Sequence, residues 1–390
     1  MKNVSATQAE LPRVAGSRRV EIVPVLLMVR ELDQGGVERD VAKIAVHLDR
    51  TRFLPHVATY YARGLRYEEL RLTSIPILHL PVRNLASRET IRLGLRLWRY
   101  IRAHGIKIVH SYDASGVFGL AIAQMAGVPV VIGSQLSYRN ILDPNTRKLL
   151  RLADRYSDAI FVNCEAIRRY MVEDEHVAAD KLELCYNGVV TTEFFPAEEA
   201  KPPELAFADL VIGTVCALRP EKELVLLQDA FARLNFPGRK LQLVIVGSGV
   251  ELPRLQGNAA RLGITAASIF LPAQRNVAHW MRALDIFVLP SLSEAFSNSL
   301  LEAMACGCCV VGSRVGGTPE LIGENARGLL FEKGNSEDLA NQLSKLIEDE
   351  SLRTELGRRA ARHARENLSI EIAVNRTADI YDRLLARLGS

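Results

Sequence analysis

The chain has no apolar run long enough to cross a membrane, since a spanning helix needs about 20 consecutive apolar residues. It also has no strong excess of either charge. The formal net charge of +4 suits an anionic small ligand or a weak preference for a membrane surface, and it gives no indication of nucleic acid. Apolar and charged fractions are close to globular averages, which excludes disordered and fibrous classes.

No secretory signal is predicted at the N-terminus. The apolar segment 22–29 is short, contains Pro24, and is followed by charge instead of a small-residue cleavage site. We interpret it as a core strand, preceded by a flexible polar tail at residues 1–19.

Cysteine is scarce, with six in the chain, and three of them are Cys306, Cys308 and Cys309. One interpretation is a thiolate metal site, and the other is a set of small buried residues where a helix meets a strand. We favour the second, because no other Cys or His cluster has the spacing of metal ligands. We expect a reduced, cytoplasmic protein.

Two α/β domains are predicted from the length and from the alternation of strands and helices. In the first half, the residue pattern predicts strands at 22–29, 53–60, 75–79, 106–110, 128–133, 159–162 and 182–186, and helices at 36–48, 90–103, 116–126 and 148–156. The second half predicts strands at 210–215, 241–246, 268–271, 286–289 and 309–312, with helices between them and terminal helices at 337–348, 352–367 and 370–388. Nearly continuous apolar strands favour parallel sheets covered on both faces, joined by right-handed crossovers.

The pattern lapses between these halves, where Pro196, Pro202 and Pro203 lie among acidic and small residues. We therefore expect Rossmann-like domains at 20–192 and 210–368, a linker at 193–209, and a helix at 369–390 that crosses back to the first domain. Ligands of such folds bind at the carboxyl ends of the strands.

The segment E-A-F-S-N-S-L-L-E, from Glu294 to Glu302, opens a helix after a buried strand. Free amides at a helix N-terminus attract phosphate, and a carboxylate one turn into the helix can accept ribose hydroxyls. The alternative is a capping box from Ser299 to Glu302, which needs no ligand.

Other strand ends carry polar residues. Arg219 and Lys222 follow the first strand of the second domain, where they can meet phosphates or remain solvated surface charges. Gly316-Gly-Thr-Pro-Glu320 predicts a turn into a helix with Thr318 as N-cap. In the first domain, Gly35-Gly36 lies between strand and helix, and His110 closes a strand as a candidate catalytic residue or a structural one.

In this order, these segments resemble family 4 of the retaining, nucleotide-sugar-dependent glycosyltransferases. The resemblance covers nearly the whole chain and is most specific at 289–307 and 316–320. It implies the GT-B fold, in which two Rossmann-like doubly wound domains face each other across a cleft. It also implies transfer of a sugar from a UDP- or GDP-sugar to a glycan or lipid-linked acceptor, with retention, in cell-surface polysaccharide or glycolipid synthesis. The first domain would then bind the acceptor and the second the donor.

The resemblance implies roles for single residues. Glu294 would contact the donor sugar at the reacting centre, and Glu302 would hold the ribose. The other expected donor contacts are Gly36, Arg219, Lys222, Arg275, Ser297, Asn298, Ser299 and Leu300.

Two positions depart from the family pattern. Ala217 stands where many relatives have the diphosphate arginine, so Arg219 is the nearby candidate, and Gln135 stands where many have a histidine. There is no Asp-x-Asp motif, so we expect cations to take the place of Mg²⁺ on the diphosphate, with neither metal nor cofactor.

Three alternatives remain open. A nucleotide-sugar 2-epimerase shares this architecture, and a catalytically silent homologue would bind the donor without turnover. The basic helix carrying Arg88, Arg92, Arg96 and Arg99 with Leu93, Leu97 and Trp98 either touches an anionic membrane surface, which would make the protein peripheral on the inner face, or packs on the sheet with a solvated basic face.

Overall fold

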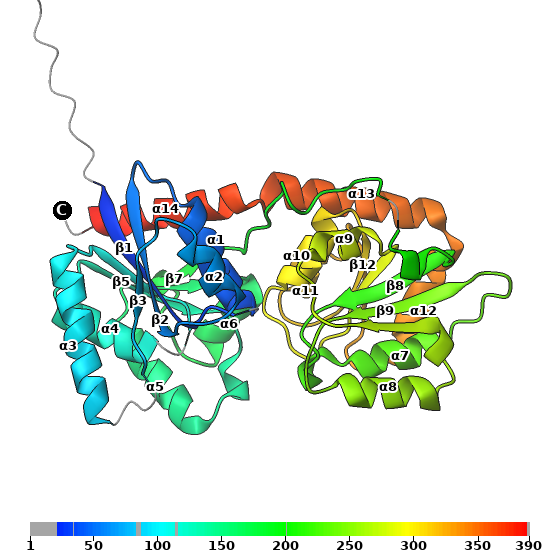
Figure 1. The fold of residues 1–390 in the computed structure, drawn as a ribbon, viewed down its shortest axis with the longest axis horizontal. Helices are drawn as coiled ribbons and strands as arrows, with labels where there is room; N and C mark the ends of the chain where they lie inside the picture. The colour runs from blue at the N-terminus through cyan, green and yellow to red at the C-terminus, as the bar shows by residue number, and fades with distance from the viewer. Residues whose placement is uncertain (1–21, 34, 83–86, 114–115, 200, 388–390) are drawn as a thin grey trace, which may run out of the picture.

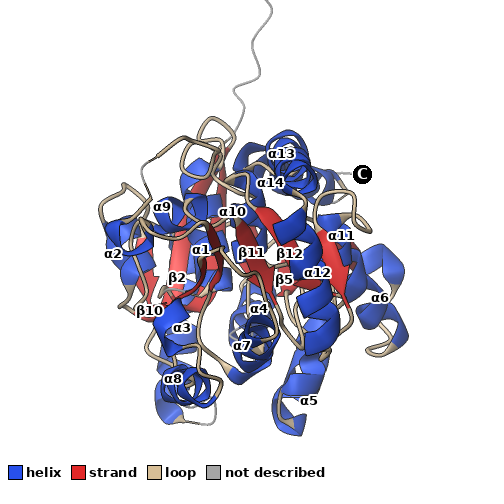
Figure 2. Cartoon of the chain, turned by 90° about the vertical axis from the view of Figure 1, so that its right-hand side faces the viewer, coloured by secondary structure: helices blue, strands red, loops and turns tan. Residues whose placement is uncertain are grey.

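Two parallel sheets, each between helices, build the protein (Figures 1 and 2). The computed structural model describes residues 22–33, 35–82, 87–113, 116–199 and 201–387. The expected flexible tail at 1–19 lies outside the described residues. The doubly wound α/β fold class is confirmed, because every strand pair in both sheets is parallel.

The first sheet has seven strands in the order β3-β2-β1-β4-β5-β6-β7. Its strands are β1 (Val23–Glu31), β2 (Phe53–Tyr61), β3 (Ile77–His79), β4 (Ile108–Ser111), β5 (Val130–Gln135), β6 (Ala159–Val162) and β7 (Leu182–Leu184). The helices joining them are α1 (Gly36–His47), α2 (Leu65–Arg71), α3 (Arg88–Ala103), α4 (Gly116–Met125), α5 (Pro144–Arg155) and α6 (Glu165–Glu173).

The second sheet has six strands in the order β10-β9-β8-β11-β12-β13. Its strands are β8 (Leu210–Val215), β9 (Leu241–Val246), β10 (Ser268–Leu271), β11 (Ile286–Leu289), β12 (Cys309–Ser313) and β13 (Leu329–Phe331). The helices are α7 (Leu224–Ala232), α8 (Leu252–Arg261), α9 (Val277–Arg282), α10 (Asn298–Ala305), α11 (Thr318–Ile322), α12 (Ser336–Glu348), α13 (Glu350–Asn367) and α14 (Ile370–Ala386).

The predicted strands agree closely with the structure, because most are short apolar runs buried on both faces. The edge strands β3 and β10 are less buried. Three elements were not predicted: α2, α6 and β13. Helix α5 also begins at Pro144, four residues before the predicted start, with Asp143 accepting hydrogen bonds from the amides of Asn145 and Thr146 as its N-cap. Proline at the first helical position favours this start.

Helix α14 packs on the first domain although it follows the second in sequence (Figure 1). Tyr381 is fully buried, and its hydroxyl lies 2.7 Å from Nδ1 of His110 in β4. The Tyr381 ring contacts Phe53 edge-on at 5.7 Å between centroids. At the surface, Arg383 forms an ion pair of 2.8 Å with Glu183. The core of the first domain therefore includes residues of α14.

We predict that Tyr381→Phe destabilises the protein, because it leaves Nδ1 of His110 buried without this partner while the ring packing stays. Such a loss costs about 1–3 kcal/mol, which should lower the melting temperature by several degrees in calorimetry. The matched control is Tyr156→Phe, at a tyrosine that is exposed on the surface. Equal melting temperatures for the two variants would contradict the assigned role of α14.

Candidate active site

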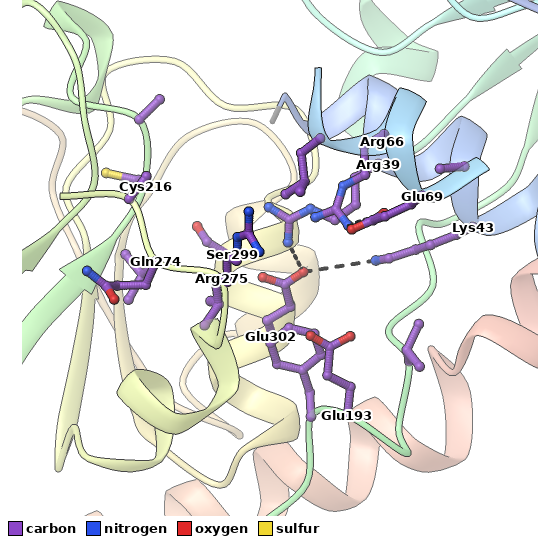
Figure 3. A pocket seen from close by; sticks show the side chains of 18 of the residues that line it. Arg39, Lys43, Arg66, Glu69, Glu193, Cys216, Gln274, Arg275, Ser299 and Glu302 are labelled. Carbon is purple, nitrogen blue, oxygen red and sulfur yellow. Dashed lines mark hydrogen bonds and ion pairs between the residues drawn. The ribbon is translucent and has the colours of Figure 1, made fainter. Parts of the chain in front are cut away.

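A cavity of about 670 Å³ lies between the two domains (Figure 3). Helices α1 and α2 form its wall on the first domain. The loops after β8, β9 and β10, together with α10, form its wall on the second. Three residues expected to bind the donor line it: Arg275, Ser299 and Glu302. The cavity thus lies at strand carboxyl ends, where this class of fold binds ligands.

Glu302 is the most buried charged residue of this cavity, with its side chain 1% exposed. Its Oε1 accepts a short hydrogen bond from Nη1 of Arg39 and lies 4.0 Å from Nζ of Lys43, both on α1 of the other domain (Figure 3). Its Oε2 is buried and makes no hydrogen bond with any described residue. A buried carboxylate oxygen without a donor indicates a place for a ligand hydroxyl or amide.

Sequence reasoning missed Arg39 and Lys43. They are four residues apart and so share one face of α1, directly after the Gly35-Gly36 turn, and this spacing was the available signal. Burial lowers the pKa of Lys43, although Glu302 and Asp40 oppose the shift. The ammonium also donates to the carbonyl oxygen of Gly188 at 3.0 Å.

Helix α10 is capped by Ser297, whose Oγ accepts from the amide of Leu300 at 3.3 Å. The predicted capping box from Ser299 is therefore wrong, because Ser299 is already inside the helix. The Leu300 amide, expected to meet phosphate, is bonded to the cap instead. The capped helix presents its first turn to the cavity through Ser299.

Lys222 and Glu294 form an ion pair of 2.6 Å between the loop after β8 and the loop before α10. Oε2 of Glu294 also accepts from Oγ of Ser291 at 3.1 Å. Burial works against the charge of Lys222, but Glu294 outweighs it and raises the lysine pKa. The structure thus brings together two residues that are 72 positions apart in the sequence.

Arg219 lies on the surface with its side chain 63% exposed, 4.0 Å from Glu221. Ala217, at the position where many relatives have an arginine, lines the cavity itself. Neither Arg219 nor Lys222 is among the residues that line the cavity. Lys222 is the more buried of the two cations and is held by Glu294.

Asn298, the first residue of α10, contacts the first domain. Its Nδ2 donates to the carboxylate of Asp40 at 3.1 Å and lies 3.4 Å from the carbonyl oxygen of Gly36. Its Oδ1 accepts from Asn187 at 3.3 Å. Burial raises the pKa of Asp40 to about 6, against the opposing effect of Lys43. Asn298 and Gly36 therefore meet each other across the cleft.

The Gly316-Gly317 turn lets two loops and two domains approach closely. Gly316 has a φ of 51°, and a Cβ there would lie 1.6 Å from the carbonyl oxygen of Glu294. A Cβ at Gly317 would lie 2.9 Å from that of Cys164 in the first domain. Glu320 then accepts from the amides of Glu165 and Ala166, both at 2.9 Å, at the start of α6.

The prediction that Thr318 caps α11 is wrong. Gly317 occupies the N-cap position, and the Thr318 hydroxyl is buried without a hydrogen bond to any described residue. Side-chain capping is not available at a glycine, so the turn is set by backbone geometry instead.

His110 does not lie in the cavity. It is fully buried, its Nδ1 pairs with Tyr381 and its Nε2 lies 2.8 Å from Oγ of Ser134. Burial lowers its pKa to about 3, so the ring is neutral near pH 7. This placement contradicts a catalytic role for His110 and assigns it a structural one, because both ring nitrogens are occupied by side-chain hydroxyls.

Gln135 is also turned away from the cavity. Its Oε1 accepts from Nε of the buried Arg139 at 2.6 Å, and Arg139 in turn pairs with Asp154. The residue at the position of the usual histidine thus belongs to a buried network in the first domain.

The cysteines are buried or half-buried and unpaired. Burial raises the pKa of Cys306 and of Cys309 to about 12, and Cys308 donates to the carbonyl oxygen of Met281 at 2.9 Å. Within the described ranges, no group of His, Cys, Asp and Glu has the arrangement of a metal site. This supports a helix-to-strand corner of small residues.

Family models and relatives identify the family of this chain. The model described as glycosyltransferase family 4 matches residues 34–193, and the model for glycosyl transferases group 1 matches residues 197–363. The D-inositol 3-phosphate glycosyltransferase of Corynebacterium jeikeium is 30% identical over 371 residues, which cover 85% of this chain and 88% of that protein. The chain belongs to glycosyltransferase family 4. It is also 26% identical over 330 residues to the N-acetyl-alpha-D-glucosaminyl L-malate synthase of Bacillus anthracis, covering 82% and 84% of the two chains.

Solved structures show the same fold. HepE of Anabaena, in complex with UDP and glucose, superposes with a TM-score of 0.81 at 21% identity, covering 93% of this chain and all of that one. A glycosyltransferase of Rickettsia africae gives a TM-score of 0.82 at 18% identity, with coverage of 94% and 99%. This family 4 enzyme therefore has the expected GT-B fold. In its described part, no helix is both long and apolar enough to span a bilayer.

The burial of Asp40, which raises the pKa of its carboxyl group, predicts a pH-dependent stability. A carboxyl group whose pKa is higher in the folded than in the unfolded protein stabilises the fold at low pH, and this stabilisation is lost as pH rises through about 6. Asp40→Asn does not titrate, so its melting temperature relative to wild type should rise from about pH 4 to about pH 7. The control is Asp379→Asn on the exposed side of α14, for which no such trend is expected. A parallel pH dependence of the wild-type and Asp40→Asn melting temperatures would contradict the prediction.

Proposed function

We propose that this glycosyltransferase transfers a hexosyl group from a nucleoside diphosphate sugar to an acceptor hydroxyl, with retention at the anomeric carbon. The observation that carries the proposal is the buried carboxylate of Glu302, which lines the cavity and whose Oε2 has no hydrogen-bond partner among the described residues. Ser299, in the first turn of α10, lines the same cavity. The HepE complexes contain UDP and UDP-glucose, which supports uracil as the first base to test.

In this proposal Glu302 accepts the ribose hydroxyls, and the loop with Gln274 and Arg275 lies beside the base. The start of α10 meets the diphosphate, since helix N-termini favour anions. Lys222 neutralises the charge that develops as the diphosphate leaves. A preorganised donor of this kind contributes about 2.7–4 kcal/mol to transition-state stabilisation.

Glu294 binds the sugar in the proposed complex. Its carboxylate is held by Lys222 and by Ser291, so its orientation is fixed before the sugar arrives. Fixed orientation of a polar group lowers the cost of reorganisation during the reaction. Closure of the cleft would exclude water and limit donor hydrolysis. We propose that protein cations balance the diphosphate charge without a metal ion.

We predict that Lys222→Ala and Glu294→Ala each reduce sugar transfer by more than about tenfold, because each removes one preorganised contact. Transfer is measured with UDP-glucose, UDP-N-acetylglucosamine and GDP-mannose as donors, with and without EDTA. The matched controls are Lys333→Ala and Glu337→Ala, both exposed on the second domain, which should retain wild-type rates.

Nearly normal turnover in both site variants would contradict the assignment of this pair. Loss of activity in EDTA that is restored by Mg²⁺ would contradict metal independence. Circular dichroism of each variant shows whether the fold is kept.

The acceptor is proposed to be a glycan or a lipid-linked hydroxyl compound at a membrane surface, as in cell-surface polysaccharide synthesis. In helix α3, Leu93 and Leu97 are buried against the domain, as packing on the sheet requires. Support for membrane contact comes from the other side of this helix. A second apolar row faces outward: Ile91 is 67%, Leu95 50% and Trp98 40% exposed. The five arginines of this helix are also exposed: Arg88, Arg92, Arg96, Arg99 and Arg102.

Such a helix, with apolar residues beside arginines at the outer edge of the first domain (Figure 1), has the composition of an interfacial helix. Helix α5, which packs against the same neighbour α4, also exposes Leu149 and Leu152, and Tyr156 is exposed directly after it. Both rows are on the proposed acceptor domain, and no residue of either helix lines the cavity.

We predict that the protein cosediments with phosphatidylcholine vesicles only when they contain phosphatidylglycerol. Arg92→Gln combined with Arg96→Gln should weaken this binding roughly tenfold or more, since each basic residue near an anionic surface contributes about 1 kcal/mol. Leu95→Ser with Trp98→Ser should weaken it as well. The control is Leu72→Ser, at a leucine exposed at the end of α2. A wild-type protein that stays in the supernatant with anionic vesicles would overturn the membrane proposal.

A further inference from the structure

The contact between Arg39 and Glu302 joins the two sides of the cleft. It uses the same carboxylate that, in the proposed function, accepts the ribose hydroxyls. Arg39 lies on α1 of the first domain, and Glu302 lies on α10 of the second (Figure 3). The two side chains are 263 positions apart in the sequence and both line the cavity. Their pairing is therefore a tertiary contact that nothing local requires.

The two oxygens of Glu302 are used differently. Oε1 takes the guanidinium of Arg39 and faces Lys43, whereas Oε2 is buried with no hydrogen bond to the described part of the chain. Nε of Arg39 is also buried without such a partner. A carboxylate can accept about four hydrogen bonds, so the guanidinium and a ligand hydroxyl can bind it together. The arginine holds one oxygen and leaves the other without a hydrogen-bond partner among the described residues.

We propose that Arg39 is a positioning residue for donor binding: it holds Glu302 from across the cleft, so that recognition of the ribose depends on the first domain. This inference rests on the proposed function. Arg39 acts through Glu302, and Lys43 at 4.0 Å assists it. Binding of the nucleotide and approach of the two domains are then linked, because both use one carboxylate.

The charges around the contact support this role. Arg39 and Lys43 face Glu302, while Asp40 is engaged by Asn298. The carboxylate of Glu302 is the main cause that raises the pKa of Arg39, so the guanidinium stays charged throughout the usual pH range. Without Arg39, the single lysine would have to balance a carboxylate that is 1% exposed, and Glu302 would turn toward Lys43 or toward water.

The test compares two nucleotides that differ only in the ribose hydroxyls, UDP and 2′,3′-dideoxyuridine diphosphate. Isothermal titration calorimetry gives the ratio of their dissociation constants for the full chain. In the wild type the dideoxy compound should bind roughly tenfold or more weakly, as expected when hydrogen bonds to a charged group are lost. In Glu302→Gln and in Arg39→Met this ratio should fall below about threefold, and Arg39→Lys should give an intermediate ratio.

The ratio separates positioning from a purely structural effect, since a general loss of stability weakens both nucleotides alike. Arg71→Met, at an exposed arginine of α2, is the matched control and should keep the wild-type ratio. A wild-type ratio in Arg39→Met, with the ratio lost in Glu302→Gln, would overturn the role of Arg39 and leave the proposed function standing. If the wild type binds neither these nucleotides nor GDP and its dideoxy counterpart, the proposed function itself fails.

Discussion

A carboxylate buried between two domains, that of Glu302, is the constraint on which the arrangement of the cleft depends. Removing a carboxylate from water is costly unless cations and donors surround it. Arg39 and Lys43 supply that compensation from α1, so α10 and α1 have to face each other. The cavity between them, and the elements that line it, follow from this pairing.

Other contacts across the cleft agree with this arrangement and use the same loops. Asn298 joins the start of α10 to Asp40 and Asn187, and Glu320 caps α6 from the opposite domain. Gly317 permits this approach, because any side chain there would meet Cys164. Helix α14 also connects the two domains, because it follows the second domain in the sequence and buries Tyr381 in the first. The motifs that look like ligand loops in the sequence therefore also hold the domains together.

Most of the fold could be predicted from the sequence, because parallel strands buried on both faces are continuous apolar runs. Strands β8 to β11 agree with the prediction to the residue. Helix α2 and strand β13 escaped prediction because they have only seven and three residues, too few for a periodic pattern. The cap of α10 was misplaced by two residues, since serines at 297 and 299 offer equal local signals and only the backbone conformation distinguishes them.

By itself, the sequence determined the two doubly wound domains, the loops at the strand ends, and the set of charged residues near the cleft. These features depend on local periodicity and on turn residues, both of which can be read from neighbouring positions in the sequence. Only the tertiary structure decided which of these residues meet. It paired Lys222 with Glu294 and Arg39 with Glu302, left Arg219 exposed, and buried His110 behind α14. The physical reason is that a buried charge is compensated by the side chains that lie next to it in the folded protein, and these come from distant parts of the chain.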